Sequence, residues 1–384
     1  MMKTSLNRLS LACCACLLFV TTFVALSHAQ RRAAKKADAP TTNLEAKADA
    51  IIRRAMEEKC IPGLVLAIVK DGQVVVRKGY GVKSLDGKML EPPDENTLFY
   101  IGSLSKAITG FGMMRLIDLE KGKLKLTDKA SQYVPGMPAK WRDIQLRYFL
   151  AHQSGIPELS QKLPTFDAML RSADGVEMAF KPPASDQQYN NFNFAVAGKV
   201  IEGVSKQPYL QFMHDEVFAK LGMTHTGYHQ QDADSATGYT RKGKSGCELK
   251  AVENVEPRGG DYGIPSGFLQ TTLADLLKLY RAIEQQRLLS PASYQAMLNR
   301  VTPGFSGTPG WFAREAGGVK IIGKNGSAQG FASQFHFAPE RRAAVIFILN
   351  LQGTQTSQMV NDLLREVCGL PLPDKALAED DPGR

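Results

Sequence analysis

Two groups of strand-like segments lie near opposite ends of the chain. In the first group, the apolar runs 64–69 and 74–78 flank Asp71-Gly72, a dipeptide that favours a tight hairpin turn. The second group consists of three apolar runs, at residues 319–322, 332–337 and 343–349. Because hairpins join neighbouring antiparallel strands, this pattern predicts one antiparallel sheet built from both chain ends.

The middle of the chain is mainly helical. Helix-like segments lie at residues 106–120, 192–204, 209–220 and 273–285, and a last one at 356–367. The predicted fold class is therefore α/β (α+β), an antiparallel sheet flanked by helices with a mainly helical inserted domain. We expect a discontinuous sheet domain at 45–125 and 256–370, a helical domain at 126–255, and a loose polar tail at 371–384.

The first 44 residues have the composition of a targeting segment. A positively charged start precedes an apolar stretch over residues 9–26, and Ser27-His28-Ala29 offers a cleavage site with small residues. Residues 1–29 are interpreted as a signal peptide, and residues 30–44 as a basic flexible linker. We expect a periplasmic or secreted protein; the alternative is a membrane anchor that is never removed.

Composition and charge restrict the partners. The chain has 384 residues and a formal net charge of +9, which suits an acidic envelope or small anionic substrates. A nucleic-acid-binding protein would need a clustered basic stripe with aromatic residues, and no such stripe follows residue 40. We therefore expect no nucleic-acid partner, and the sequence implies no stable protein partner.

The cysteine and histidine patterns predict neither a disulfide nor a metal site. Cys60, Cys247 and Cys368 follow the signal segment, and their odd number and wide spacing give no disulfide framework and no zinc signature. We interpret them as buried small hydrophobic residues. His225 and His229 are four residues apart in a predicted loop without a carboxylate motif, so we expect no metal there.

The stretch Ile101-Gly102-Ser103-Leu104-Ser105-Lys106 contains a candidate nucleophile and a candidate base. If a helix begins at Ser103, then Ser103 and Lys106 share a face, whereas Ser105 points elsewhere. The positive end of the helix dipole would stabilise a developing alkoxide on Ser103. The alternative is that Ser103 is an ordinary helix cap.

Two distant stretches supply what a lone serine lacks. Tyr189-Asn190-Asn191 precedes a predicted helix, and Lys324-Asn325-Gly326 ends a predicted strand. Free lysine and tyrosine both titrate near about pH 10, too high for a base at neutral pH. If Tyr189 lies between Lys106 and Lys324, the two positive charges would favour its phenolate form. Repulsion between the two lysines, together with burial, would favour a neutral lysine. Whether Lys106 or Tyr189 takes the serine proton stays open at this stage.

The order Ser-x-x-Lys, Tyr-x-Asn, Lys-x-Gly resembles the serine β-lactamase and penicillin-binding protein superfamily, above all its class C branch and the related esterases and peptidases. Three more stretches, at residues 146–158, 216–228 and 263–279, are similar to other segments of that family. The resemblance covers roughly residues 45–370. It implies a β-lactamase/transpeptidase-like fold and an oxyanion hole made by the backbone N–H groups of Ser103 and Ser327.

The resemblance also assigns substrate-binding roles. Asn191 is expected to hold the lysine base and the substrate's carbonyl side, and Gly326 to let the substrate lie close as an added strand. Asn325 stands where the family usually carries a threonine or serine hydroxyl that meets the substrate carboxylate. Lys324 stands where many esterase-like relatives have histidine, and its fixed charge favours anionic substrates.

The function implied by the resemblance is that of an exported serine hydrolase. Ser103 would form an acyl-enzyme with small esters or with β-lactam and related amide bonds, while Lys106 and Tyr189 move the protons and water releases the acid. No cofactor is needed. The alternatives are a D-alanyl-D-alanine carboxypeptidase acting on cell-wall peptide, and a penicillin-binding module that does not turn over.

Overall fold

The computed structural model describes residues 43–87, 89–159, 163–181, 183–228, 235–243, 246–253 and 260–375. The predicted signal peptide, most of the predicted linker, His229 and the end of the predicted tail lie outside these residues. The chain divides into two units, Met1–Asp49 and Ala50–Arg384, and the fold and the candidate site belong to the second. Within the described residues, none of the helices combines the length and the hydropathy that crossing a membrane requires.

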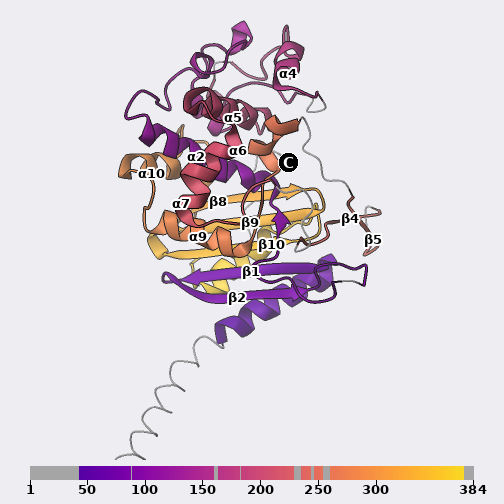
Figure 1. Ribbon diagram of the computed structural model, residues 1–384. Helices are drawn as coiled ribbons and strands as arrows, with labels where there is room; N and C mark the ends of the chain where they lie inside the picture. Colours follow the sequence, from indigo (N-terminus) through magenta and orange to yellow (C-terminus); the bar gives the residue numbers. More distant parts are fainter. Residues whose placement is uncertain are drawn as a thin grey trace, which may run out of the picture. The chain divides into compact units, whose positions relative to one another are not determined.

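The antiparallel sheet predicted from both chain ends is present (Figure 1). Its strand order is β2-β1-β10-β9-β8-β7, and every neighbouring pair is antiparallel. The bounds are β1 Gly63–Lys70, β2 Gln73–Gly81, β7 Phe312–Ala316, β8 Val319–Ala328, β9 Phe331–Ala338 and β10 Ala343–Leu349. The two groups of strands meet where β1 pairs with β10, with Leu64 opposite Leu349.

Strand β1 is apolar from Leu64 to Val69, and both of its faces are covered. Side chains alternate across a strand, and Val65, Ala67 and Val69 belong to the large apolar core. The alternate residues Leu64 and Leu66 are equally buried on the opposite face. The π-helical turn Leu363–Val367 also packs on this strand. Two covered faces explain why β1 is a continuous hydrophobic run rather than an alternating one.

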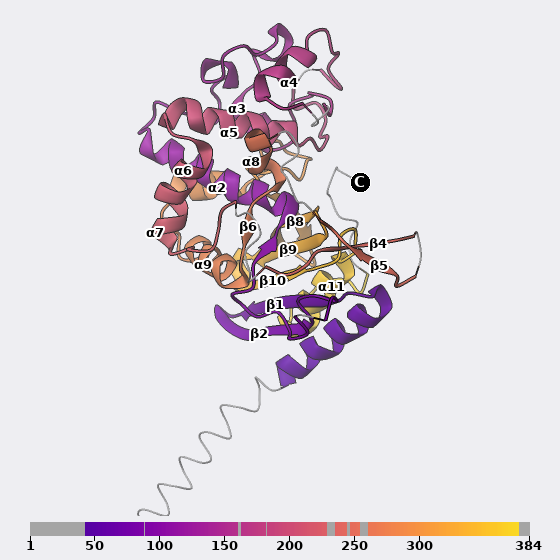
Figure 2. The same cartoon turned by 45° about the vertical axis from the view of Figure 1, so that its right-hand side comes forward.

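The predicted helical region lies between the two groups of strands in sequence, and most of its helices lie above the sheet in the view of Figure 2. Its principal helices are α2 Ser105–Leu119, α5 Phe192–Ser205, α6 Tyr209–Met213, α8 Ile264–Gly267, α9 Leu273–Glu284 and α10 Pro291–Leu298. Helix α2 packs against α5, α8 and α10, while α9 packs on β1 and β10. The fold class is therefore as predicted, and the boundaries proposed for its two domains stay predictions.

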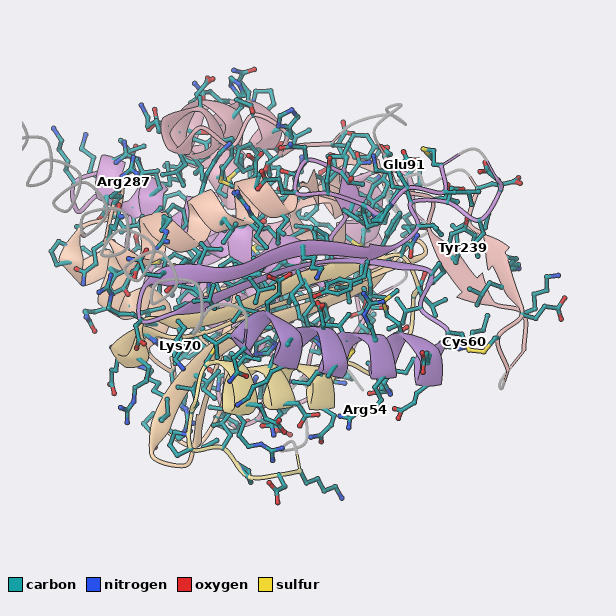
Figure 3. The ribbon with its side chains drawn as sticks, turned by 90° about the horizontal axis from the view of Figure 1, so that it is seen from below. Arg54, Cys60, Lys70, Glu91, Tyr239 and Arg287 are labelled. Carbon is teal, nitrogen blue, oxygen red and sulfur yellow. A yellow bond between two sulfur atoms is a disulfide. The ribbon has the colours of Figure 1, made fainter. Side chains whose placement is uncertain are left out.

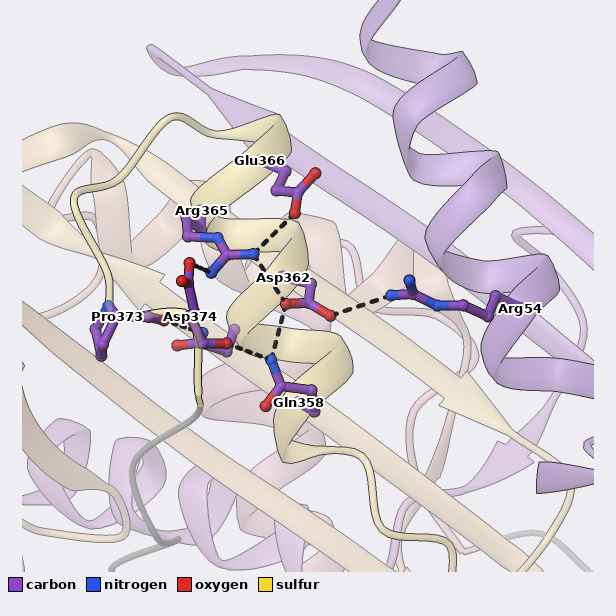
Figure 4. Close-up of polar contacts among 8 residues, drawn as sticks. Arg54, Gln358, Asp362, Arg365, Glu366, Pro373 and Asp374 are labelled. Atoms are coloured by element: carbon purple, nitrogen blue, oxygen red, sulfur yellow. Dashed lines mark hydrogen bonds and ion pairs between the residues drawn. The ribbon is translucent and has the colours of Figure 1, made fainter. Parts of the chain in front are cut away.

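The C-terminal segment is held by a group of charged side chains (Figure 4). Arg365, in the turn after α11 (Ser357–Asp362), pairs with Asp362, Glu366 and Asp374. Arg54 lies 3.6 Å from the Asp362 carboxylate. Such partly exposed pairs contribute little energy singly, so we regard this group as fixing the direction of the chain up to Asp374.

The prediction that the cysteines form no disulfide is wrong. Cys60 and Cys247 are bonded, with their Cα atoms 5.4 Å apart and a sequence separation of 187 positions (Figure 3). The bond joins the turn before β1 to the hairpin of β4 (Tyr239–Arg241) and β5 (Leu249–Ala251). An odd count shows only that one thiol is left over, and Cys368 is that buried free thiol among the described residues.

Removing this disulfide should lower stability. A cross-link across so long a loop restricts the unfolded chain, so replacing both Cys60 and Cys247 by serine is expected to lower the free energy of unfolding by about 2–4 kcal/mol. Urea unfolding of the oxidised, the reduced and the doubly substituted protein measures the effect. Reductant should not destabilise the double variant further, and equal midpoints for all three samples would contradict a stabilising role.

Candidate active site

Ser103 lies in a turn of 3-10 helix, Gly102–Leu104, just before α2. Neither this turn nor α2 has a side-chain cap, so the alternative interpretation of Ser103 as a helix cap is wrong. The turn passes close to strand β8: a Cβ on Gly102 would lie 2.7 Å from the backbone nitrogen of Ser327. Gly102 also has a φ of +52°, so both its conformation and its surroundings require glycine.

Lys106 follows one turn later and is fully buried. Its Nζ lies 3.0 Å from Ser103 Oγ and 2.7 Å from Asn191 Oδ1, and it also contacts the backbone oxygen of Ser266. The predicted i, i+3 pairing of Ser103 and Lys106 is therefore present in the structure. Ser105 points away, as expected: it is buried, and its Oγ accepts the backbone N–H of Leu269 at 3.1 Å.

Tyr189 lies between the two lysines. Its hydroxyl is hydrogen-bonded to Ser103 Oγ. Lys106 Nζ is 4.8 Å and Lys324 Nζ 5.0 Å from the centre of the tyrosine ring. The structure thus brings together Ser103, Lys106, Tyr189 and Lys324, four side chains from three distant stretches of sequence.

The Lys324-Asn325-Gly326 stretch lies within β8 rather than at the end of a strand, because β8 continues to Ala328. Lys324 is buried, with its Nζ 4.2 Å from the ring centre of Phe312. A Cβ on Gly326 would lie 1.9 Å from the backbone oxygen of Ile101, so glycine lets β8 approach the turn that carries Ser103. Asn325 is partly buried and Ser327 is exposed beside them.

The two residues of the predicted oxyanion hole, Ser103 and Ser327, lie on segments that pack against each other. The 3-10 turn of Ser103 packs directly against β8. Ser327 keeps its backbone nitrogen close to Gly102, while its side-chain Oγ accepts the N–H of Gly353 at 3.2 Å. The assignment of the Ser103 and Ser327 N–H groups as oxyanion donors stays a prediction.

His152 supports Tyr189 from behind, a contact that sequence patterns did not indicate. The buried imidazole is stacked on the tyrosine ring, with centroids 4.4 Å apart and 30° between the planes. Its Nδ1 accepts the backbone N–H of Asn190 at 3.2 Å. Burial, reinforced by the charges of Lys324 and Lys106, holds the pKa of His152 well below its ordinary value, so this ring adds no third positive charge.

Asn190, the middle residue of the tyrosine motif, fixes the loop below the site. Its Nδ2 donates to the backbone oxygens of Ile156 and Pro157 at 2.7 and 2.9 Å, and its Oδ1 accepts the N–H of Phe192 at 2.7 Å. No role was predicted for Asn190. The signal in the sequence was an asparagine, a residue type that often closes turns, close to the start of a predicted helix.

His225 was one of the two histidines at which we expected no metal site. The backbone N–H of His225 donates to the Asp275 carboxylate at 2.8 Å, which gives this stretch a structural contact. Across the residues that the structure describes, no group of three or more His, Cys, Asp or Glu side chains could hold a metal ion.

Comparison with known proteins places this geometry in a family. The family model described as Beta-lactamase matches residues 48–368. Protein flp of Staphylococcus aureus (strain MW2) is 26% identical in an alignment 351 residues long that covers 85% of this chain and 67% of that protein. PbpX of Bacillus subtilis (strain 168) is 29% identical in an alignment 306 residues long that covers 78% of this chain and 73% of that protein.

Two solved structures have the same fold. The octameric penicillin-binding protein homologue from Pyrococcus abyssi superposes with a TM-score of 0.73 and 25% identity, over 85% of this chain and 79% of that chain. D-alanine carboxypeptidase AmpC from Burkholderia cenocepacia superposes with a TM-score of 0.70 and 23% identity, over 85% of this chain and 99% of that chain. These likenesses confirm the β-lactamase/transpeptidase-like fold. Since the family model also spans most of the sequence, the chain belongs to the Beta-lactamase family.

Proposed function

We propose that this protein is a serine hydrolase that forms an acyl-enzyme on Ser103 with small ester or β-lactam and related amide substrates. The observation that carries the proposal is the pair of contacts at the Ser103 hydroxyl, one to Tyr189 and one to Lys106. A serine hydroxyl is a weak nucleophile until a neighbouring base takes its proton, and both neighbours can act as that base.

The proposed reaction has two halves. In the first, Ser103 Oγ gives its proton to Lys106 or Tyr189 and bonds to the substrate's carbonyl carbon; the bond to the alcohol or amine then breaks, and the leaving group takes up a proton. In the second half, water gives a proton to the same pair of side chains and bonds to the acyl carbon. The bond between that carbon and Ser103 Oγ then breaks, Oγ takes the proton back, and the acid leaves. Backbone N–H donors of Ser103 and Ser327 would stabilise the tetrahedral oxyanion in both halves, each by about 3 kcal/mol.

Charge at the site favours anionic substrates. Lys324 is buried beside Tyr189, and a fixed cation in a desolvated site attracts a carboxylate strongly. This feature supports a second candidate, a D-alanyl-D-alanine carboxypeptidase, because the terminal carboxylate of such a peptide would pair with Lys324. The name of the Burkholderia neighbour is in line with this candidate. Asn325 would replace the usual hydroxyl as a donor to that carboxylate.

We also propose that the protein is exported to an oxidising compartment. The signal-like composition of residues 1–29 is one support. The Cys60–Cys247 disulfide is an independent one, because disulfides persist in the periplasm and outside the cell but are rare in the cytosol.

A substrate panel tests the proposed function. Wild-type protein and the Ser103→Ala variant are assayed with a short p-nitrophenyl ester, with the chromogenic β-lactam nitrocefin and with a peptide ending in D-Ala-D-Ala. We expect turnover of at least one of the first two by the wild type and none by the variant. Turnover of the peptide alone would favour the carboxypeptidase, and a β-lactam adduct that persists without turnover of any substrate would favour a penicillin-binding module. Equal rates for both proteins would contradict the proposal.

A further inference from the structure

The loop that Asn190 fixes carries a carboxylate, that of Glu158, next to the candidate active site. Glu158 follows Pro157 directly, and its two oxygens accept separate hydrogen bonds from Asn191. Oε2 accepts the backbone N–H and Oε1 accepts the side-chain Nδ2, both at 3.2 Å. Asn191 is the residue from which α5 starts, so the negative charge of Glu158 also lies at the favourable end of that helix.

These contacts decide which way the Asn191 amide points. An asparagine amide has an acceptor end and a donor end, and an ionised carboxylate can only accept. Glu158 therefore keeps Nδ2 on its own side, which leaves Oδ1 facing Lys106 at 2.7 Å. If the amide turned over, its oxygen would face the carboxylate and its N–H₂ group would face the lysine, so both contacts would be lost.

The direction of this amide matters for Lys106 as a base. A neutral amine has two N–H donors and one lone pair. Asn191 Oδ1 and the Ser266 backbone oxygen can only accept, so they take the two N–H groups and leave the lone pair for Ser103 Oγ at 3.0 Å. With the amide reversed, the lone pair would face Asn191 Nδ2, and Ser103 would receive an N–H instead of giving up its proton.

We propose that Glu158 is a positioning residue that acts through Asn191 to aim the Lys106 lone pair at Ser103. The inference rests on the proposed function, in which the Ser103 proton passes to Lys106 Nζ as Oγ bonds to the acyl carbon. It assigns Glu158 no contact with the substrate. The backbone oxygens of Ile156 and Pro157, held by Asn190, keep the loop in place so that the carboxylate stays beside Asn191.

The test replaces the carboxylate while keeping its size. In Glu158→Gln an NH₂ donor replaces one of the two carboxylate oxygens, so the side chain no longer offers a separate acceptor to each Asn191 N–H group. The rate constant for acylation by a p-nitrophenyl ester should fall about ten-fold, the equivalent of about 1.4 kcal/mol. Glu366→Gln, which removes a carboxylate of the C-terminal charged group in Figure 4, is the matched control and should leave the rate unchanged. Burst amplitude reports the fraction of folded, competent protein in each sample.

The pH–rate profile separates positioning from mere support of the fold. The charged or titratable groups around Lys106 are Tyr189, Lys324, the neutral His152 and, through Asn191, Glu158. Losing the anion and the Asn191 acceptor disfavours the ammonium form of Lys106, so the acid limb of the profile should move to lower pH in Glu158→Gln. A role in folding alone would lower the burst amplitude and leave the acid limb where it is.

A double substitution tests whether Glu158 acts through Asn191. In an Asn191→Asp background both side-chain oxygens accept, so Lys106 meets an acceptor whichever way the group turns, and Glu158→Gln should then cause no further loss of acylation rate. An additive loss in that background, or a wild-type rate and acid limb in Glu158→Gln itself, would overturn the inference. Full activity of Ser103→Ala would instead overturn the proposed function, so the two failures are distinguishable.

Discussion

Replacing Ser103 by alanine is expected to lower the rate of ester hydrolysis by at least about 10³-fold, because removal of the nucleophile leaves only binding and oxyanion stabilisation. The side chain is small and only partly buried in a 3-10 turn, so the fold should survive its truncation. Rates per folded molecule, with folding checked by circular dichroism, measure the effect.

Ser105→Ala is the matched control for this prediction, because it removes a hydroxyl two residues away, at the first position of α2. Ser105 Oγ accepts the Leu269 N–H in the interior, so the variant should lose about 1–3 kcal/mol of stability but retain its activity per folded molecule. If Ser105→Ala lost activity and Ser103→Ala kept it, the two serines would have to exchange roles.

Lys106→Met is expected to lower the rate of acylation by about 10²–10⁴-fold, the usual contribution of a positioned acid or base. Methionine fills a similar volume but takes no proton from Ser103, and it leaves Asn191 Oδ1 and the Ser266 carbonyl without the lysine donor. Stopped-flow measurement of the burst with a p-nitrophenyl ester separates acylation from later steps.

Lys320→Met is the control for a lost positive charge. Lys320 is on β8, the strand that carries Lys324, but its Nζ donates to Asn299 and lies outside the site. Because substitutions away from the site usually have small effects, its replacement should change the acylation rate by less than about two-fold. A Lys106→Met variant with the rate of the Lys320→Met variant would show that Lys106 is not needed as base or as charge.

The sheet was predictable where local signals are strong. The Asp71-Gly72 turn and the flanking apolar runs correspond to the β1–β2 hairpin, and the last apolar run corresponds to β10. Strand β8 was predicted too short, because Gly323, Gly326 and Ser327 interrupt the β-rich pattern that marks its first part. These glycines are present because His336 and the Ile101 carbonyl lie against them, which only the folded chain reveals.

The candidate site was predictable as a set of reactive groups but not as a supported structure. Ser103, Lys106, Tyr189 and Lys324 were found from residue type and order, and the structure brings them together. His152, Asn190 and Glu158 act through contacts with residues about 30 to 40 positions away, and such contacts leave no local period or spacing. The Cys60–Cys247 bond escaped prediction for the same reason, since no rule of spacing pairs cysteines so far apart.

The most direct test of the central claim, that Ser103 carries the acyl group, is mass spectrometry of protein quenched during turnover of a p-nitrophenyl ester. We expect a mass increase equal to that of the acyl group, located by peptide mapping on Ser103, in the wild type and in Ser105→Ala but not in Ser103→Ala. An acyl group on another residue, or the same adduct in Ser103→Ala, would contradict the claim.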